Sequence, residues 1–152
     1  MPLTVVGIDP GTRGGIAVLD DASGRVLLAQ GFAPDMTVTE FTALIKSALA
    51  LGPVKGVYLE KVGHKRGDGS RGSFTFGRAG GVDFLLSALG VKALYVPPIF
   101  WQAKLECLTS GNKNISKRRA TELFGNQVKV THNISDALLI AEYGRRQLDL
   151  RG

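Results

Sequence analysis

Three short apolar segments near the start of the chain constrain its fold most strongly. They cover residues 3–9, 14–20 and 25–32, they are rich in β-branched side chains, and turn-forming residues separate them. Such short connections join neighbouring strands as hairpins, which makes the three segments antiparallel. The chain therefore begins with part of an antiparallel β-sheet.

The remainder of the chain alternates between strand and helix patterns. Thr37 and Glu40 have the spacing of a capping box, and an apolar stripe continues the helix that they begin. The sequence predicts strands over 54–60 and 91–96 and helices over 37–51, 73–89, 99–108, 116–124 with Ser116 as N-cap, and from Asn133 past Tyr143. Without a repeat or a linker, residues 1–152 should form a single mixed α/β domain.

Composition narrows the class of protein. The chain is 44% hydrophobic, which suits a globular core. Its single cysteine, Cys107, cannot form an internal disulfide, and this favours a reducing, intracellular setting. No apolar run approaches the length of a membrane span, and the first residues read as a strand and not as a signal peptide. We therefore expect no membrane association.

Basic charge gathers in two stretches. The formal net charge is +6, while residues 61–78 and 104–119 each carry a net charge of +4. Clustered basic charge in loop-like regions indicates a polyanion partner. Ordinary solubilising charge is the alternative interpretation.

Acidic residues stand where the predicted strands end. Asp9 ends the first strand and Glu60 ends the fourth, while His132 and Asp136 are spaced to share one face of the last helix. If the two strands are neighbours, the carboxylates lie close together. Carboxylate and imidazole groups are suitable ligands for Mg²⁺ or Mn²⁺, and such a cluster could hold two ions roughly 3.5–4 Å apart.

Each of these residues also has a simpler interpretation. Asp9 before Pro-Gly could be a turn former, Asp136 could interact favourably with a helix dipole, and His132 could be a surface histidine. Their joint placement is what favours a metal site.

Five segments together resemble the RuvC-like Holliday-junction resolvases, especially the phage-type and chloroplast-type branches. The matching segments are GIDPGTRGGIAVLD (7–20), VYLEKV (57–62), SFTFGRAGG (73–81), SKRRATELF (116–124) and HNISDALLIAEYG (132–144). The resemblance implies an RNase H-like fold, with a five-stranded mixed β-sheet flanked by α-helices. It also implies a homodimeric Mg²⁺-dependent endonuclease that cuts four-way DNA junctions symmetrically in DNA recombination and repair.

The same resemblance assigns a catalytic metal-binding quartet. It maps onto Asp9, Glu60, His132 and Asp136, with two Mg²⁺ ions per site and Mn²⁺ as a substitute. Members of the family differ in the spacing of the third position, so Asn133 competes with His132. We prefer His132 because imidazole is the better ligand.

DNA contacts are expected from the basic stretches and the glycine-rich loop. Lys117 is predicted to be catalytic, in preference to Lys113, because Ser116-Lys117 should open a helix whose free N–H groups favour anions. Phe74 and Phe76 could reach the junction or could pack inside the protein, and Trp101 could stack on a base or belong to the core. The full DNA-binding set is Lys61, Lys65, Arg66, Arg71, Phe74, Phe76, Arg78, Lys113, Lys117 and Arg118.

The small residues of the helix around 73–89 make it the candidate homodimer interface. The alternative functions are an RNase H-like nuclease acting on other branched DNA or on RNA, and a catalytically inactive DNA-binding relative. An actin-like ATPase or sugar kinase shares the D-x-G-T turn, but its second half-domain does not fit into 152 residues. We expect a cytoplasmic location in a bacterium or phage-infected cell, with an organelle as the alternative.

Overall fold

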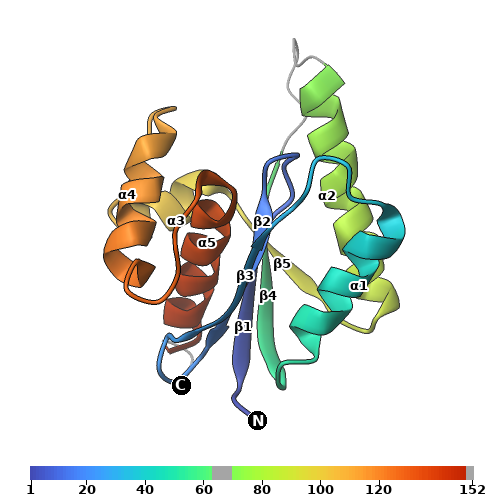
Figure 1. Ribbon diagram of the computed structural model, residues 1–152, viewed down its shortest axis with the longest axis horizontal. Helices are drawn as coiled ribbons and strands as arrows, with labels where there is room; N and C mark the ends of the chain where they lie inside the picture. The colour runs from blue at the N-terminus through green and yellow to red at the C-terminus, as the bar shows by residue number, and fades with distance from the viewer. Residues whose placement is uncertain (63–69, 150–152) are drawn as a thin grey trace.

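The protein is a five-stranded sheet with helices on both faces (Figure 1). The structure, a computed structural model, describes residues 1–62 and 70–149, with the side chains of residues 79–147 in the second range. The strands are β1 (Thr4–Asp9), β2 (Gly15–Asp20), β3 (Val26–Gly31), β4 (Val54–Glu60) and β5 (Ala93–Val96). The helices are α1 (Val38–Leu49), α2 (Ser70–Ala88), α3 (Pro98–Lys104), α4 (Lys113–Phe124) and α5 (His132–Asp149).

The sheet is mixed, as the sequence predicts. Its strand order is β3-β2-β1-β4-β5. The first three strands form an antiparallel meander, while β4 pairs in parallel with β1 and β5 pairs in parallel with β4. The predicted α/β class with a five-stranded mixed sheet is confirmed.

Both faces of the sheet are buried, because α3, α4 and α5 cover one face and α1 and α2 cover the other (Figure 1). Residues of β1 alternate between the two layers: Val5 belongs to the core under α5, while Val6 and Ile8 belong to the core under α1 and α2. Such two-sided burial explains why the strand segments are almost entirely apolar.

Helix α5 lies directly against the sheet, and glycine at position 7 permits this close approach. A Cβ atom on Gly7 would collide with the carbonyl oxygen of Ala137 and the amide nitrogen of Ala141. Thus the middle of β1 contacts the backbone of α5 with no side chain between them.

The predicted start of a helix is correct where the sequence offers a single good N-cap residue. The Thr37 side chain accepts a hydrogen bond from the Glu40 amide at 3.1 Å, so the predicted start of α1 is confirmed. The predicted N-cap Ser116 is wrong. Helix α4 begins at Lys113 with Asn112 as N-cap, because Asn112 offers an equivalent acceptor and Gly111 adopts the left-handed conformation before it.

Two further boundaries differ. Helix α2 begins at Ser70, earlier than the predicted start at residue 73, and α3 ends at Lys104, before the predicted end at 108. No helix in the described part of the chain has the length and apolar character needed to cross a membrane.

Candidate active site

A cavity of about 460 Å³ opens where β1 and β4 end. Three predicted acidic residues line it, together with basic and hydroxyl side chains from the surrounding loops and α4. The residues that matter for the site are Asp9, Arg13, Glu60, Lys113, Ser116 and Asp136. The cavity therefore brings together three members of the predicted quartet.

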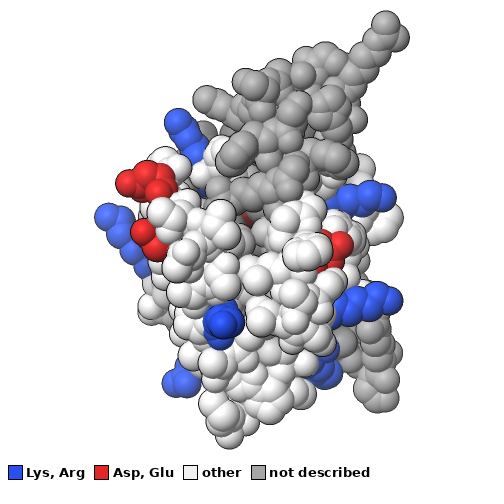
Figure 2. Space-filling model, turned by 90° about the vertical axis from the view of Figure 1, so that its right-hand side faces the viewer, with Lys and Arg blue, Asp and Glu red and all other residues white. Residues whose placement is uncertain are grey.

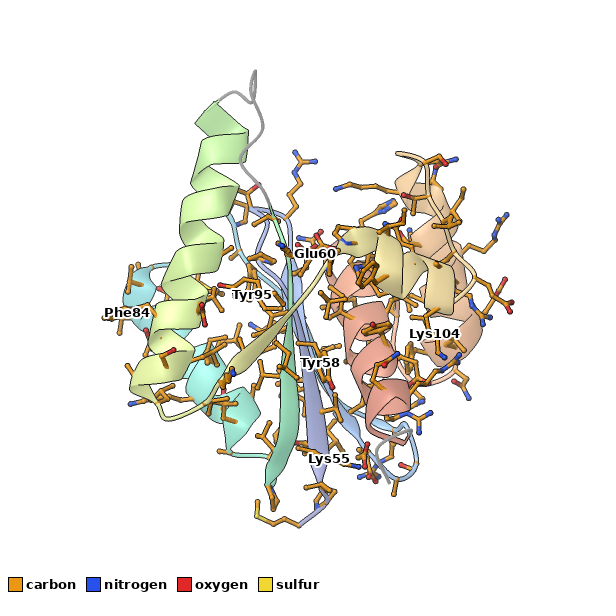
Figure 3. The ribbon with its side chains drawn as sticks, turned by 180° about the vertical axis from the view of Figure 1, so that it is seen from behind. Lys55, Tyr58, Glu60, Phe84, Tyr95 and Lys104 are labelled. Atoms are coloured by element: carbon orange, nitrogen blue, oxygen red, sulfur yellow. The ribbon has the colours of Figure 1, made fainter. Side chains whose placement is uncertain are left out.

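Strand geometry brings Asp9 and Glu60 to the cavity. Ile8 on β1 lies opposite Leu59 on the parallel strand β4, so the residue that follows each of them comes to the same end of the sheet. Alternation also directs Asp9 toward the α5 layer, because Val5 of the same strand packs in that layer. Glu60 does the same on β4, and Figure 3 shows it at the strand end beside α3.

Asp136 comes from α5, one residue before the contact of Ala137 with Gly7. Ser116 of α4 lowers the pKa of the Asp136 carboxyl group, while the Ser116 hydroxyl donates to the Lys113 carbonyl oxygen at 3.1 Å. Asp136 Oδ1 is buried and has no hydrogen-bond partner among the described residues. A buried acceptor without a partner is costly, so this oxygen is available to a ligand.

The three carboxyl groups destabilise one another's charge. Burial, followed by repulsion from Asp9 and Asp136, raises the pKa of Glu60 to about 8, against the effects of Trp101 and Lys113. Burial and then Asp9 raise the pKa of Asp136 to about 6. A bound cation would relieve this repulsion.

The residues of this cavity fit Mg²⁺. They offer hard carboxylate oxygens, mutual repulsion and an unsatisfied buried acceptor. At the same time, no group of three or more His, Cys, Asp or Glu side chains among the described residues is arranged to hold a metal ion by itself. These observations agree, because Mg²⁺ keeps several waters and usually needs only one or two carboxylates together with substrate phosphate oxygens.

The turn after β1 fixes Asp9. The Gly11 amide donates to Asp9 Oδ1 at 3.1 Å, and a Cβ atom on Gly14 would collide with the Asp9 carbonyl group. The turn-forming interpretation of Asp9 is therefore correct as well. It does not compete with a metal role, because a carboxylate oxygen can accept more than one interaction.

The residue predicted for the third position of the quartet lies outside the cavity. His132 begins α5 with an exposed side chain and is not among the residues that line the cavity. Its competitor Asn133 is half-buried, and a Cβ atom on Gly31 would meet the Asn133 side chain. Neither residue lines the cavity, so a ligand role for His132 remains a prediction.

The two candidate catalytic lysines differ in their position relative to the cavity. Lys113 lines the cavity and lowers the pKa of both Glu60 and Asp136. Lys117 does not line it. The argument that Lys117 opens a helix is wrong, because α4 begins at Lys113 and places Lys117 in its second turn.

The structure describes the side chains of only some of the other DNA-binding candidates. Lys61 and Arg118 are exposed. Lys65 and Arg66 lie outside the described residues, and Arg71, Phe74, Phe76 and Arg78 belong to the part of α2 whose side chains are not described.

Sequence reasoning missed several residues of the site. Trp101 belongs to the core, where it is only 1% exposed, so the stacking interpretation of this residue is wrong. Its indole Nε1 donates to Glu60 Oε2 at 3.1 Å. Arg13 and Ser116 also border the carboxylates. No local sequence signal could reveal the Trp101–Glu60 contact, because the two residues are 41 positions apart.

Comparison with solved structures shows a fold similar to that of RuvC. No family model matches the sequence, and no curated protein sequence matches it. Two similar solved structures are those of RuvC from Thermus thermophilus. The one in complex with a Holliday junction substrate has a TM-score of 0.70, 20% identity, and coverage of 95% of this chain and 96% of that chain. The other has a TM-score of 0.71, 19% identity, and coverage of 98% and 97%.

These neighbours confirm the predicted RuvC-like fold over almost the whole chain. The assignment to a phage-type or chloroplast-type branch remains a prediction.

Proposed function

We propose that this chain is a metal-dependent endonuclease that resolves four-way DNA junctions by symmetric hydrolysis of phosphodiester bonds, in DNA recombination and repair. The observation that carries the proposal is the convergence of Asp9, Glu60 and Asp136 on one cavity of a RuvC-like fold. A related fold solved with a Holliday junction substrate supports the choice of DNA.

Asp9, Glu60 and Asp136 would hold Mg²⁺, with His132 as a further candidate ligand. Bound Mg²⁺ supplies Lewis acidity and lowers the pKa of a coordinated water. The carboxylates would bind and orient the ions, and the hydrogen bond from the Gly11 amide to Asp9 limits the side-chain movements that would misplace this ligand. This division of work suits hydrolysis of a phosphodiester with no covalent protein intermediate.

Basic residues of the cavity would receive the DNA backbone. Lys113 brings positive charge to the carboxylates, and it would offset negative charge developing on the scissile phosphate. Arg13 enters the same cavity from the turn after β1. A planar guanidinium binds phosphate oxygens in pairs, so Arg13 is suited to positioning the cleaved strand.

A homodimer would supply two active sites for the two opposed strands. Helices α1 and α2 border an apolar groove of about 590 Å³, and Val38 and Phe84 at this groove are 83% and 78% exposed. Figure 2 looks onto this face, where uncharged residues occupy most of the coloured surface. We therefore assign the second copy to the face formed by α1 and α2.

A cleavage assay tests the proposed function. A synthetic four-way junction and a linear duplex of matched sequence are incubated with the protein, with and without Mg²⁺. We expect paired symmetric nicks in the junction only, and only with Mg²⁺. Asp9→Asn should still bind the junction and should not cut it, because it removes charge from the metal site and keeps the shape of the side chain.

Other outcomes decide against the proposal. Equal cutting of the linear duplex would remove junction selectivity and favour a general RNase H-like nuclease. Binding without cutting by the unaltered protein under every divalent metal would identify an inactive DNA-binding relative.

A further inference from the structure

Glu60 has a buried neighbour that the proposed reaction does not use. Trp101 of α3 donates its indole N–H to Glu60 Oε2 at 3.1 Å, while Glu60 itself lies on the cavity wall. Trp101 is the single tryptophan of the chain, and it is almost completely buried. The contact joins the core under α5 directly to one of the three carboxylates.

The chemistry of the indole group suits a role in holding a carboxylate. An indole N–H only donates, and it has one proton, so it occupies one oxygen of Glu60 and leaves the other to a second partner. The indole group carries no charge, so it does not neutralise Glu60 and leaves that carboxylate able to bind a cation. A lysine in the same place would neutralise Glu60 and compete with the metal.

Trp101 also has a rigid support. It packs in the same buried cluster as Leu105 of the α3 C-cap, Phe124 of α4 and Leu138 of α5. A side chain fixed on all sides loses little further freedom when it forms a hydrogen bond, so it can impose one orientation on its acceptor. Its neighbours on α3, Pro98 and Gln102, line the cavity as well.

We propose that Trp101 is a positioning residue for Glu60: its N–H fixes one carboxylate oxygen, so that the other is presented to a divalent cation in the cavity. This inference rests on the proposed metal-dependent function. Glu60 would bind the cation, and Trp101 would act only through Glu60.

Biosynthetic replacement of tryptophan gives a sharp test, because it alters Trp101 alone. Benzothienylalanine has nearly the shape of tryptophan with sulfur in place of the N–H group, whereas 5-fluorotryptophan retains that group and serves as the control. Mg²⁺ binding is measured by calorimetry on the DNA-free protein. We expect the Kd to rise by about 10- to 100-fold with the sulfur analogue and to stay near that of the unaltered protein with 5-fluorotryptophan.

Two encoded variants separate positioning from packing. Trp101→Phe removes the donor and part of the core volume, while Phe124→Leu disturbs the same buried cluster without touching Glu60. We expect both to unfold at lower urea concentration, and only Trp101→Phe to bind Mg²⁺ more weakly. Trp101 fluorescence should also change on Mg²⁺ addition in the unaltered protein, and not in Glu60→Gln.

The inference is overturned if the sulfur analogue binds Mg²⁺ as tightly as the unaltered protein, or if the DNA-free protein binds no Mg²⁺. Failure of the proposed function looks different. If the junction is never cut and Mg²⁺ affinity still depends on the Trp101 N–H, the positioning role stands and the substrate assignment fails. If the junction is cut equally well by the sulfur analogue and its Mg²⁺ affinity is unchanged, only the positioning role fails.

Discussion

At the residue scale, the proposed metal binding should be linked to proton binding by Glu60. Without a cation, the pKa of Glu60 is raised to about 8, so its carboxyl group is largely protonated at neutral pH. A cation must displace that proton, and binding should therefore release protons and strengthen as pH rises. The same mutual repulsion that disfavours three bare carboxylates favours an ion among them.

This linkage predicts how stability depends on pH. The pKa values of Glu60 and Asp136 rise from 4.5 and 3.8 to about 8 and about 6 on folding, so the native state binds more protons than the unfolded chain between these limits. Stability without metal is therefore highest below about pH 4 for these two groups and falls as pH rises to about 8. Thermal unfolding in a chelating buffer measures the trend.

Glu60→Gln provides the control for that measurement, because it removes the group with the larger shift. Its melting temperature should fall less with pH than that of the unaltered protein, and Mg²⁺ should stabilise it less. Identical pH profiles for the two proteins would contradict the linkage.

Lys113 and Lys117 make a second matched pair at the residue scale. We expect Lys113→Ala to slow single-turnover junction cleavage by about 100-fold or more, because its charge acts on the carboxylates of the cavity. Lys117→Ala should weaken junction binding and reduce its dependence on salt, with little effect on cleavage at saturation. The reverse result would restore Lys117 as the catalytic lysine.

The third ligand position can be settled by comparing His132→Ala with Asn133→Ala. If His132 binds metal, its removal should abolish cleavage and leave binding intact. If Asn133→Ala is inactive while folded and His132→Ala is active, the assignment from the resemblance is wrong. Circular dichroism must accompany the assay, because Asn133 packs against Gly31.

At the scale of elements, the sequence predicted the strands and helix ends that depend on residues close together in the chain. The Thr37 cap and the three apolar segments lie within single elements, and the structure confirms them. The predicted start of α4 is wrong because Asn112 and Ser116 are both good N-cap residues, and the left-handed Gly111 directly before Asn112 favours the earlier start. Ser116 instead lies inside the helix, where its hydroxyl group donates to the Lys113 carbonyl oxygen and its side chain lines the same cavity as Asp136.

The residues of the candidate site also differ in whether the sequence could predict them. Asp9 and Glu60 could be predicted because each ends a recognisable strand. The contact of Trp101 with Glu60 could not, since the two residues are 41 positions apart. Ser116 comes to the cavity from α4, which is also distant in sequence from both strands. Spacing alone places His132 and Asp136 on one face of α5, but it cannot say which side chain turns toward the cavity.

The contact between β1 and α5 gives a prediction at this scale. Gly7→Ala should lower the free energy of unfolding by about 1–3 kcal/mol or more, because the added methyl group meets helix backbone that cannot turn away. It should also reduce cleavage, since α5 carries Asp136. Urea unfolding and the junction assay measure both effects.

Gly80→Ala is the matched control for Gly7→Ala. Gly80 lies within α2, and a Cβ atom there would meet nothing within 4 Å. Alanine is the better helix former, so this variant should be as stable as the unaltered protein or more stable by roughly 0.5–1 kcal/mol. Equal destabilisation by both substitutions would contradict the close-approach argument.

At the scale of the whole molecule, the helical layers on the two faces of the sheet form different surface features. The layer of α3, α4 and α5 supports the cavity, whereas α1 and α2 present the apolar groove on the other side of the sheet (Figure 1). Separate faces allow the chain to associate without blocking its own site.

Association through the second face is testable with a charge substitution. Phe84→Glu should convert the dimer to a monomer in analytical ultracentrifugation, because Phe84 projects outward from α2 (Figure 3) and a buried charge would be unpaired. Phe100→Glu is the control: Phe100 is 58% exposed on α3, in the opposite layer, and its substitution should leave the mass unchanged. A dimeric Phe84→Glu protein would place the interface elsewhere.

The alternation of side chains along β1 limits which insertions and deletions a related sequence can accept during evolution. Asp9 and Val5 point to the same layer because they are four positions apart, which is an even step along the strand. One residue inserted within β1 would turn Asp9 toward α1 and α2, and it would bury a carboxylate there without a partner. Active chains with this architecture should therefore admit length changes within β1 and β4 only in steps of two.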